Sequence, residues 1–83
     1  MSALADDAPL LEVTGLIQAI DPTLRELLLL VNGRPERFDL APECVLVLRR
    51  ERVKLRLLQP HDCARVCYAE TPHGRVARTI RVD

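Results

Sequence analysis

The sequence predicts an all-β protein, a small five-stranded antiparallel barrel of the OB-like or SH3-like type. Apolar and polar residues alternate with period two over 62–70 and 75–82, and more loosely over 11–20, as expected for strands with one buried face. The dipeptide Asn32-Gly33 is a strong hairpin signal between two further strands. The leucine-rich run 26–31 is too short for a stable helix, so we assign it to a strand.

The 83 residues are enough for one domain with a small core. Residues 1–9 are small and acidic and end in Pro9, which predicts a disordered N-terminal leader. Residues 10–83 are then expected to form a single small β-barrel domain. Apolar residues make up 48% of the chain and the only aromatic residues are Phe38 and Tyr68, so the core must be largely aliphatic.

The first strand is expected over residues 11–20. Its two faces should carry Val13, Ile17 and Ala19 on one side and Glu12, Thr14 and Gln18 on the other. Gly15 inside this strand predicts a bend or bulge that lets the strand curl round a barrel. The segment 21–24, Asp-Pro-Thr-Leu, predicts a turn, because the Asp side chain can accept from nearby backbone amides and Pro presets φ.

A two-residue turn at Asn32-Gly33 fixes the register of the hairpin around it. The expected cross-strand pairs are Val31–Arg34, Leu30–Pro35, Leu29–Glu36, Leu28–Arg37 and Leu27–Phe38. Leu28 and Leu30 then point away from the core. Pro35 makes the third strand, 34–40, an edge strand at that point, because proline has no N–H to donate.

In the second half of the chain, Ala41-Pro42-Glu43 is predicted to end the third strand. A short apolar run over 45–48, a polar turn over 49–54 and a helical or 3₁₀ turn within 55–60 are expected next. The core is expected to receive Leu55, Leu57 and Leu58 from this segment, Ala64, Val66 and Tyr68 from the fourth strand, and Val76, Ile80 and Val82 from the closing strand.

Charge and cysteine content limit the classes of function. Twelve basic and twelve acidic residues cancel, so the overall field gives no reason to expect tight non-specific binding to nucleic acid. The N-terminus lacks the pattern of a signal peptide, and no run approaches the length of a membrane span. Three cysteines cannot all pair within one molecule. These features predict a cytoplasmic protein with no membrane association.

A resemblance rests on the order of several short motifs. These are Val13-Thr-Gly15, Ile20-Asp21-Pro22, Phe38-Asp-Leu40, 58–62 leading into Ala64, Val66 and Tyr68, and Ala77 with Ile80 and Val82. The pattern resembles bacterial small OB-like barrel domains of unknown function and, more distantly, the periplasmic copper- and silver-binding barrels. The metal-binding relatives use His, Met and Trp ligands, whereas this chain has no Trp and only Met1. The resemblance therefore implies the architecture without that metal site.

One position departs from the family pattern. The residue before Asp62 is usually Gly in such turns and is His61 here. Histidine is among the residue types enriched at positive φ, so a conformational role accounts for it.

The outward leucines predict the function that we favour, a non-catalytic module that binds a protein partner or a second copy of itself. The expected contact residues are Leu28, Leu30 and Pro35, because contiguous exposed aliphatic side chains usually mark a binding surface. An alternative is binding of single-stranded nucleic acid through the Arg-rich loop 49–56. Its candidate residues are Arg49, Arg50, Arg52, Lys54 and Arg56.

Metal binding near His61 and Cys63 is the third possibility. On a strand, Cys63 and Cys67 share a face about 13 Å apart, which is too far for both to bind one ion. Cys44 or His73 from elsewhere in the chain could complete such a site. His61, Asp62 and Cys63 do not form a catalytic set, because adjacent strand residues point to opposite faces. No nucleotide-binding glycine motif occurs, so we predict neither enzymatic activity nor a cofactor.

Overall fold

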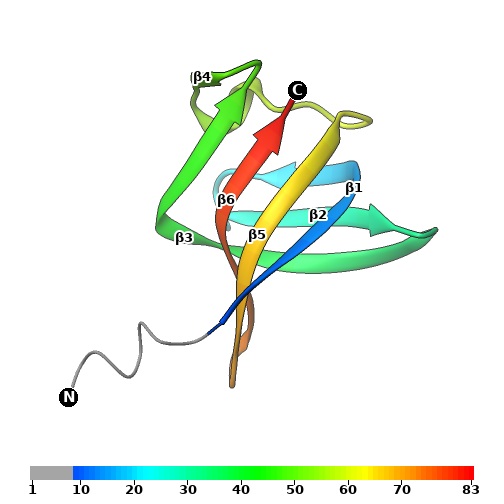
Figure 1. The fold of residues 1–83 in the computed structure, drawn as a ribbon, viewed down its shortest axis with the longest axis vertical. Coiled ribbons are helices and arrows are strands. Elements are labelled where there is room, and N and C mark those ends of the chain that lie inside the picture. The colour runs from blue at the N-terminus through cyan, green and yellow to red at the C-terminus, as the bar shows by residue number, and fades with distance from the viewer. Residues whose placement is uncertain (1–8) are drawn as a thin grey trace.

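The computed structural model describes residues 9–83, and the predicted leader lies outside this range except for Pro9. Its elements are the strands β1 (Leu10–Asp21), β2 (Glu26–Val31), β3 (Arg34–Leu48), β4 (Glu51–Arg52), β5 (Cys63–Thr71) and β6 (Gly74–Val82), with a 3₁₀ turn η1 (Leu55–Leu57). The strands lie in the order β2-β1-β5-β6-β3-β4, and a further pairing of β2 with β3 closes the barrel (Figure 1).

The predicted fold class is confirmed. Five long strands form the closed sheet, and β4 adds only two residues to one end of β3. Every pairing is antiparallel except that between β3 and β6, which is parallel. The 3₁₀ turn within 55–60 is also confirmed, but Leu57, which we expected in the core, is 51% exposed. A single 3₁₀ turn can bury only part of its surface, and here Leu55 and Leu58 are the buried residues.

The hairpin β2–β3 has the predicted register at every pair from Val31–Arg34 to Leu27–Phe38. Asn32 and Gly33 have φ values of 52° and 80°, as a type I′ turn requires. Leu27, Leu29 and Phe38 are buried inside the barrel. The predicted turn at 21–24 also forms, since the Asp21 side chain accepts hydrogen bonds from the amides of Thr23 and Leu24.

The predicted chain break at Ala41-Pro42-Glu43 is wrong, because β3 continues to Leu48. The strand turns a corner instead, seen at the left of Figure 1, and its register against β6 shifts between Leu40 and Val45. Proline is tolerated at such an irregularity, where no ladder hydrogen bond is needed from its nitrogen. The polar turn also differs, because only Arg49 and Arg50 form it before β4 begins.

Two bulges change which residues face inward. The pairing of β1 with β2 skips Gln18, so Ala19 is exposed and Ile20 packs on the core. The pairing of β6 with β5 skips Arg78, so Ala77 rather than Val76 is buried with Ile80 and Val82. An extra residue reverses the alternation beyond it, which is why the simple period-2 assignments of Ala19 and Val76 are wrong.

The core is aliphatic except for one aromatic pair. Phe38 is buried and meets Tyr68 edge to face, with ring centroids 5.0 Å apart. Ala64 and Val66 are fully buried on β5, and Tyr68 packs against them at the edge of the core, as predicted. Glu36 occupies an inward position at the open end of the barrel, where Arg75 forms an ion pair with it.

Two backbone positions hold β1 in place. A Cβ on Gly15 would lie 2.4 Å from the carbonyl oxygen of Leu30, so the strand can approach β2 only with glycine there. His61 has a φ of 77°, which confirms the conformational role expected from the sequence. Its amide donates to the carbonyl of Ile17 at 2.7 Å and links the turn before β5 to β1.

Candidate interaction surfaces on the outside of the barrel

Three strands present a contiguous apolar surface to solvent. Leu30 of β2 pairs with Leu16 of β1 on one side and with Pro35 of β3 on the other, and all three point away from the core. The next row contains Ala19 and Leu28. We call these five residues the apolar patch. Leu16 is 44% exposed, Ala19 and Pro35 are exposed, and Leu28 and Leu30 are half-buried.

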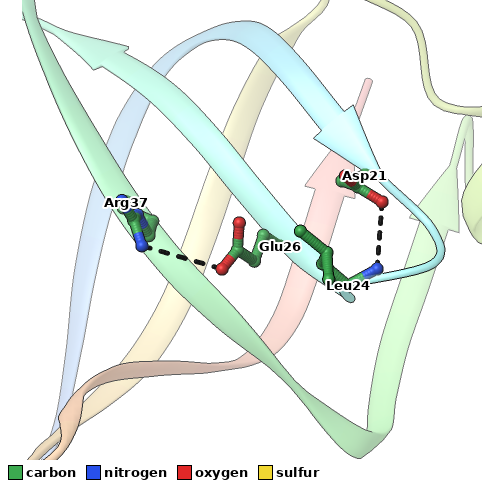
Figure 2. Close-up of polar contacts among 4 residues, drawn as sticks. All are labelled: Asp21, Leu24, Glu26 and Arg37. Carbon is green, nitrogen blue, oxygen red and sulfur yellow. Dashed lines mark hydrogen bonds and ion pairs between the residues drawn. The ribbon is translucent and has the colours of Figure 1, made fainter.

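One end of the apolar patch is acidic. Asp21, Glu26 and Asp39 form the row beyond Leu28, and Glu26 lies 3.7 Å from Arg37 of β3 (Figure 2). A shallow groove of about 360 Å³ runs between this row and Leu28. The patch therefore has a hydrophobic centre and a charged edge, which is the usual anatomy of a protein interface.

The structure brings together the predicted contact residues Leu28, Leu30 and Pro35 on neighbouring strands. The sequence analysis missed Leu16 and Ala19. The sequence contains a signal for Leu16. It precedes Ile17, which faces inward, so strand alternation places Leu16 on the outer face. Its position beside Leu30, however, follows from the crossing of β1 over β2, which no local pattern specifies.

The residues of the predicted basic cluster are divided between the β3–β4 turn, β4 and the region of η1. Arg49 and Arg50 make the tight turn between β3 and β4, Arg52 belongs to β4, and Lys54 and Arg56 flank or belong to η1. All five residues are exposed. Arg52 is the one that the sheet places in register with further arginines, on β6 and β5.

The metal candidates stay apart from one another. Cys63 and Cys67 share the outer face of β5, as predicted, and pair with Leu16 and Glu12. Among residues 9–83 no group of three or more His, Cys, Asp or Glu side chains is close enough to hold a metal ion. The thiols of Cys44, Cys63 and Cys67 are free.

Cys44 differs from the other thiols because it is partly covered by the barrel. Burial raises the pKa of its thiol to about 11, with Glu43 acting in the same direction and Arg25 opposing it. A thiol with such a pKa is protonated at neutral pH and is a poor nucleophile or metal ligand. Cys44 is therefore a poor candidate for a nucleophile or a metal ligand.

The strand order and the closed sheet define the class of fold, a small OB-like barrel. Solved structures of CusF have this fold at 12% sequence identity. Apo-CusF from Escherichia coli matches with a TM-score of 0.74 over 93% of this chain and 90% of that chain. CusF–Ag(I) from Escherichia coli matches with a TM-score of 0.74 over 92% and 94%, and another Ag(I)CusF structure with 0.73 over 90% and 99%.

These neighbours establish the architecture expected from the sequence resemblance. Two of these CusF structures hold Ag(I). No family model matches the sequence. No curated protein matches it either.

The predicted cytoplasmic location is corrected by the same comparison. CusF is a periplasmic protein, so the solved neighbours point away from the cytoplasm. Residues 9–83 contain no helix with the length and hydrophobicity needed to cross a membrane.

Proposed function

We propose that this chain is a non-catalytic binding module that associates with a second copy of itself through the apolar patch. The observation that carries the proposal is the continuity of that patch across three strands, with Leu30 at its centre between Leu16 and Pro35. Contiguous exposed apolar side chains on a small soluble domain usually mark an interaction site.

The arrangement of the patch supports a second copy as the partner. Leu28 and Leu30 lie at its centre, and the charged residues Glu26 and Arg37 lie together at the Leu28 end. A two-fold axis between Leu28 and Leu30 stacks the leucines of the two copies. It also puts the charged ends of the two copies at opposite ends of the interface, so that the apolar centre meets itself, as an isologous interface requires.

Light scattering with size-exclusion chromatography tests this proposal. We expect the wild type to show twice the chain mass of 9.4 kDa at high concentration. The variant Leu28→Lys/Leu30→Lys should elute as a monomer, because four lysines would meet across the two-fold axis. Circular dichroism checks that the variant remains folded, which is expected because both side chains point outward and a lysine stem can lie along the surface.

A matched pair of single variants distinguishes association through the patch from association through any exposed leucine. Leu16 and Leu57 are 44% and 51% exposed, but only Leu16 belongs to the patch. Leu16→Lys should weaken the dimer and Leu57→Lys should not. A wild type that is monomeric up to about 1 mM, the weak limit of specific binding, removes the proposal. Equal effects of Leu16→Lys and Leu57→Lys also remove it.

Metal binding near His61 and Cys63 is a second candidate, supported by the silver-bound CusF structures of the same fold. Cys63 is an exposed thiol, and soft ions such as Ag(I) prefer sulfur ligands. Titration calorimetry with Ag(I) on the wild type and on Cys63→Ser tests it, with Cys67→Ser as the matched control. A tight site lost only in Cys63→Ser supports this candidate. Equal weak binding by all three proteins counts against it.

A further inference from the structure

A second outer surface, on the other half of the barrel, carries a row of arginines. Arg52 of β4 pairs with Val47 of β3, Val47 pairs with Arg81 of β6, and Arg81 pairs with Arg65 of β5. Directly paired residues point to the same side of a sheet, so the three guanidinium groups emerge on one face. We call Arg52, Arg65 and Arg81 the arginine row. All three are exposed.

Among the described residues no close ion pair neutralises the arginine row, although Glu12 lines a shallow depression with Arg65 and Arg81, and Asp83 lines another with Arg81. Within residues 9–83 the ion pairs shorter than 4.0 Å involve Arg37, Arg75 and Arg78, and none involves the row. Arg65 and Arg81 lie directly opposite each other, an arrangement that destabilises a sheet through like-charge repulsion. An anion bound between them would remove this repulsion.

The turn beside the row is unusual in a way that supports an anion site. Arg49 and Arg50 have φ values of 51° and 72°, in the left-handed region where most residues are strained. The hairpin β2–β3 places Asn and Gly at the same kind of turn. Arg50 also lines a shallow depression of about 390 Å³ together with Arg81, Val47 and Asp83. The turn therefore adds a fourth guanidinium next to the row.

The dimensions of the row indicate the kind of ligand. From β4 to β5 it spans three strand spacings, about 14 Å, which is longer than a single phosphate group. None of the outward residues beside it is aromatic, so no ring is available for base stacking; these residues are Glu12, Thr14, Val45, Val47, Cys67 and Thr79. We propose that the arginine row binds a linear chain of phosphate groups by charge, without recognising bases.

Two probes represent the two sources of a linear phosphate chain. Inorganic tripolyphosphate represents a free polyphosphate, and a fluorescein-labelled ten-nucleotide thymidine oligomer represents a single-stranded nucleic acid. Titration calorimetry follows the first and fluorescence anisotropy the second, both at about 20 mM salt, where phosphate contacts are strong. We expect the logarithm of the binding constant for the oligomer to fall with the logarithm of salt with a slope of about −2 to −3, for three or four phosphate contacts.

A pair of double variants with the same change in net charge tests the position of the site. Arg65→Gln/Arg81→Gln removes two members of the row, whereas Arg34→Gln/Arg56→Gln removes two exposed arginines elsewhere. The row variant should lose about tenfold or more in affinity and about 1.4 of the salt slope, and the control about threefold or less. Because Arg56 belongs to the loop 49–56, the control also tests nucleic-acid binding through that loop alone.

Thermal unfolding gives a readout that does not depend on the titration. Without added phosphate, the row variant should unfold at the same or a higher temperature than the wild type, because the repulsion between Arg65 and Arg81 is gone. Tripolyphosphate should raise the midpoint of the wild type more than that of the variant. Row-dependent binding of either probe supports the proposal and identifies the source. Equal losses in both double variants, or no binding of either probe at about 100 μM, overturn it.

Discussion

The replacement of Gly15 by alanine tests how closely β1 crosses β2. A Cβ at this position would lie 2.4 Å from the carbonyl oxygen of Leu30, 3.1 Å from its carbonyl carbon and 3.0 Å from Cγ of Leu29. The first two atoms are backbone, held by the β1–β2 ladder at the pair Leu16–Leu30. The clash can be relieved only by separating the strands, so both packing and a ladder hydrogen bond are affected.

We expect Gly15→Ala to lower the free energy of unfolding by about 2–4 kcal/mol, from overpacking at 1–3 kcal/mol and about 1 kcal/mol for a lost hydrogen bond. For a domain of this size each kcal/mol lowers the midpoint of thermal unfolding by about 4–8 °C. The expected fall is therefore about 10–30 °C, measured by circular dichroism.

Gly33→Ala is the matched control, because nothing lies within 4 Å of a Cβ there and only its φ of +80° opposes alanine. Its cost should be about 1 kcal/mol. The double variant Gly15→Ala/Leu29→Ala shows whether the obstacle is backbone. If Gly15→Ala costs little stability when introduced into Leu29→Ala, or if it costs no more than Gly33→Ala in the wild type, the reasoning about the crossing is refuted.

Two further predictions concern Cys44 and His61. Burial raises the pKa of the Cys44 thiol from its ordinary value of 9.0 to about 11, so its contribution to stability is complete below pH 9 and is lost as the pH rises through 11. The unfolding temperature of the wild type should fall more over this range than that of Cys44→Ala, and equal declines would contradict the assignment. His61 has a φ of 77°. His61→Val should therefore lower the free energy of unfolding by about 1–2 kcal/mol, whereas His61→Gly should change it by less than about 1 kcal/mol, as measured by urea unfolding. Tolerance of Val at this position would show that the strain is absent.

The features that the sequence predicts well are local. The register of the β2–β3 hairpin follows from two turn residues, since a type I′ turn leaves one way to pair the strands that it joins. The parallel pairing of β3 with β6 joins segments far apart in the chain. Neither segment carries a sequence pattern that identifies its partner strand. The bulges at Gln18 and Arg78 are local but lack a compositional signal such as glycine, so the alternation beyond each of them was assigned to the wrong face.

The same distinction applies to the surfaces. Leu28, Leu30 and Pro35 were predicted together because one hairpin turn fixes all three. The arginine row could not be predicted, although Arg65 alternates with Ala64 and Val66, and Arg81 with Ile80 and Val82, which are expected in the core. The adjacency of Arg65 and Arg81 depends on the pairing of β5 with β6 after the bulge, and Arg52 joins them only through Val47 of β3.

Both surfaces depend on the corner in β3, between Leu40 and Val45. Before the corner β3 pairs with β2 and supports the apolar patch, and after it β3 pairs with β6 and β4 and supports the arginine row. Phe38 and Leu46, on either side of the corner, are buried in one shared core. Because buried side chains fill that core, both proposed binding surfaces are on the outside of the barrel. They adjoin at β1 and β5, where Leu16 pairs with Cys63 and Thr14 pairs with Arg65, so the proposed dimer would place a second copy near the Arg65 end of the arginine row.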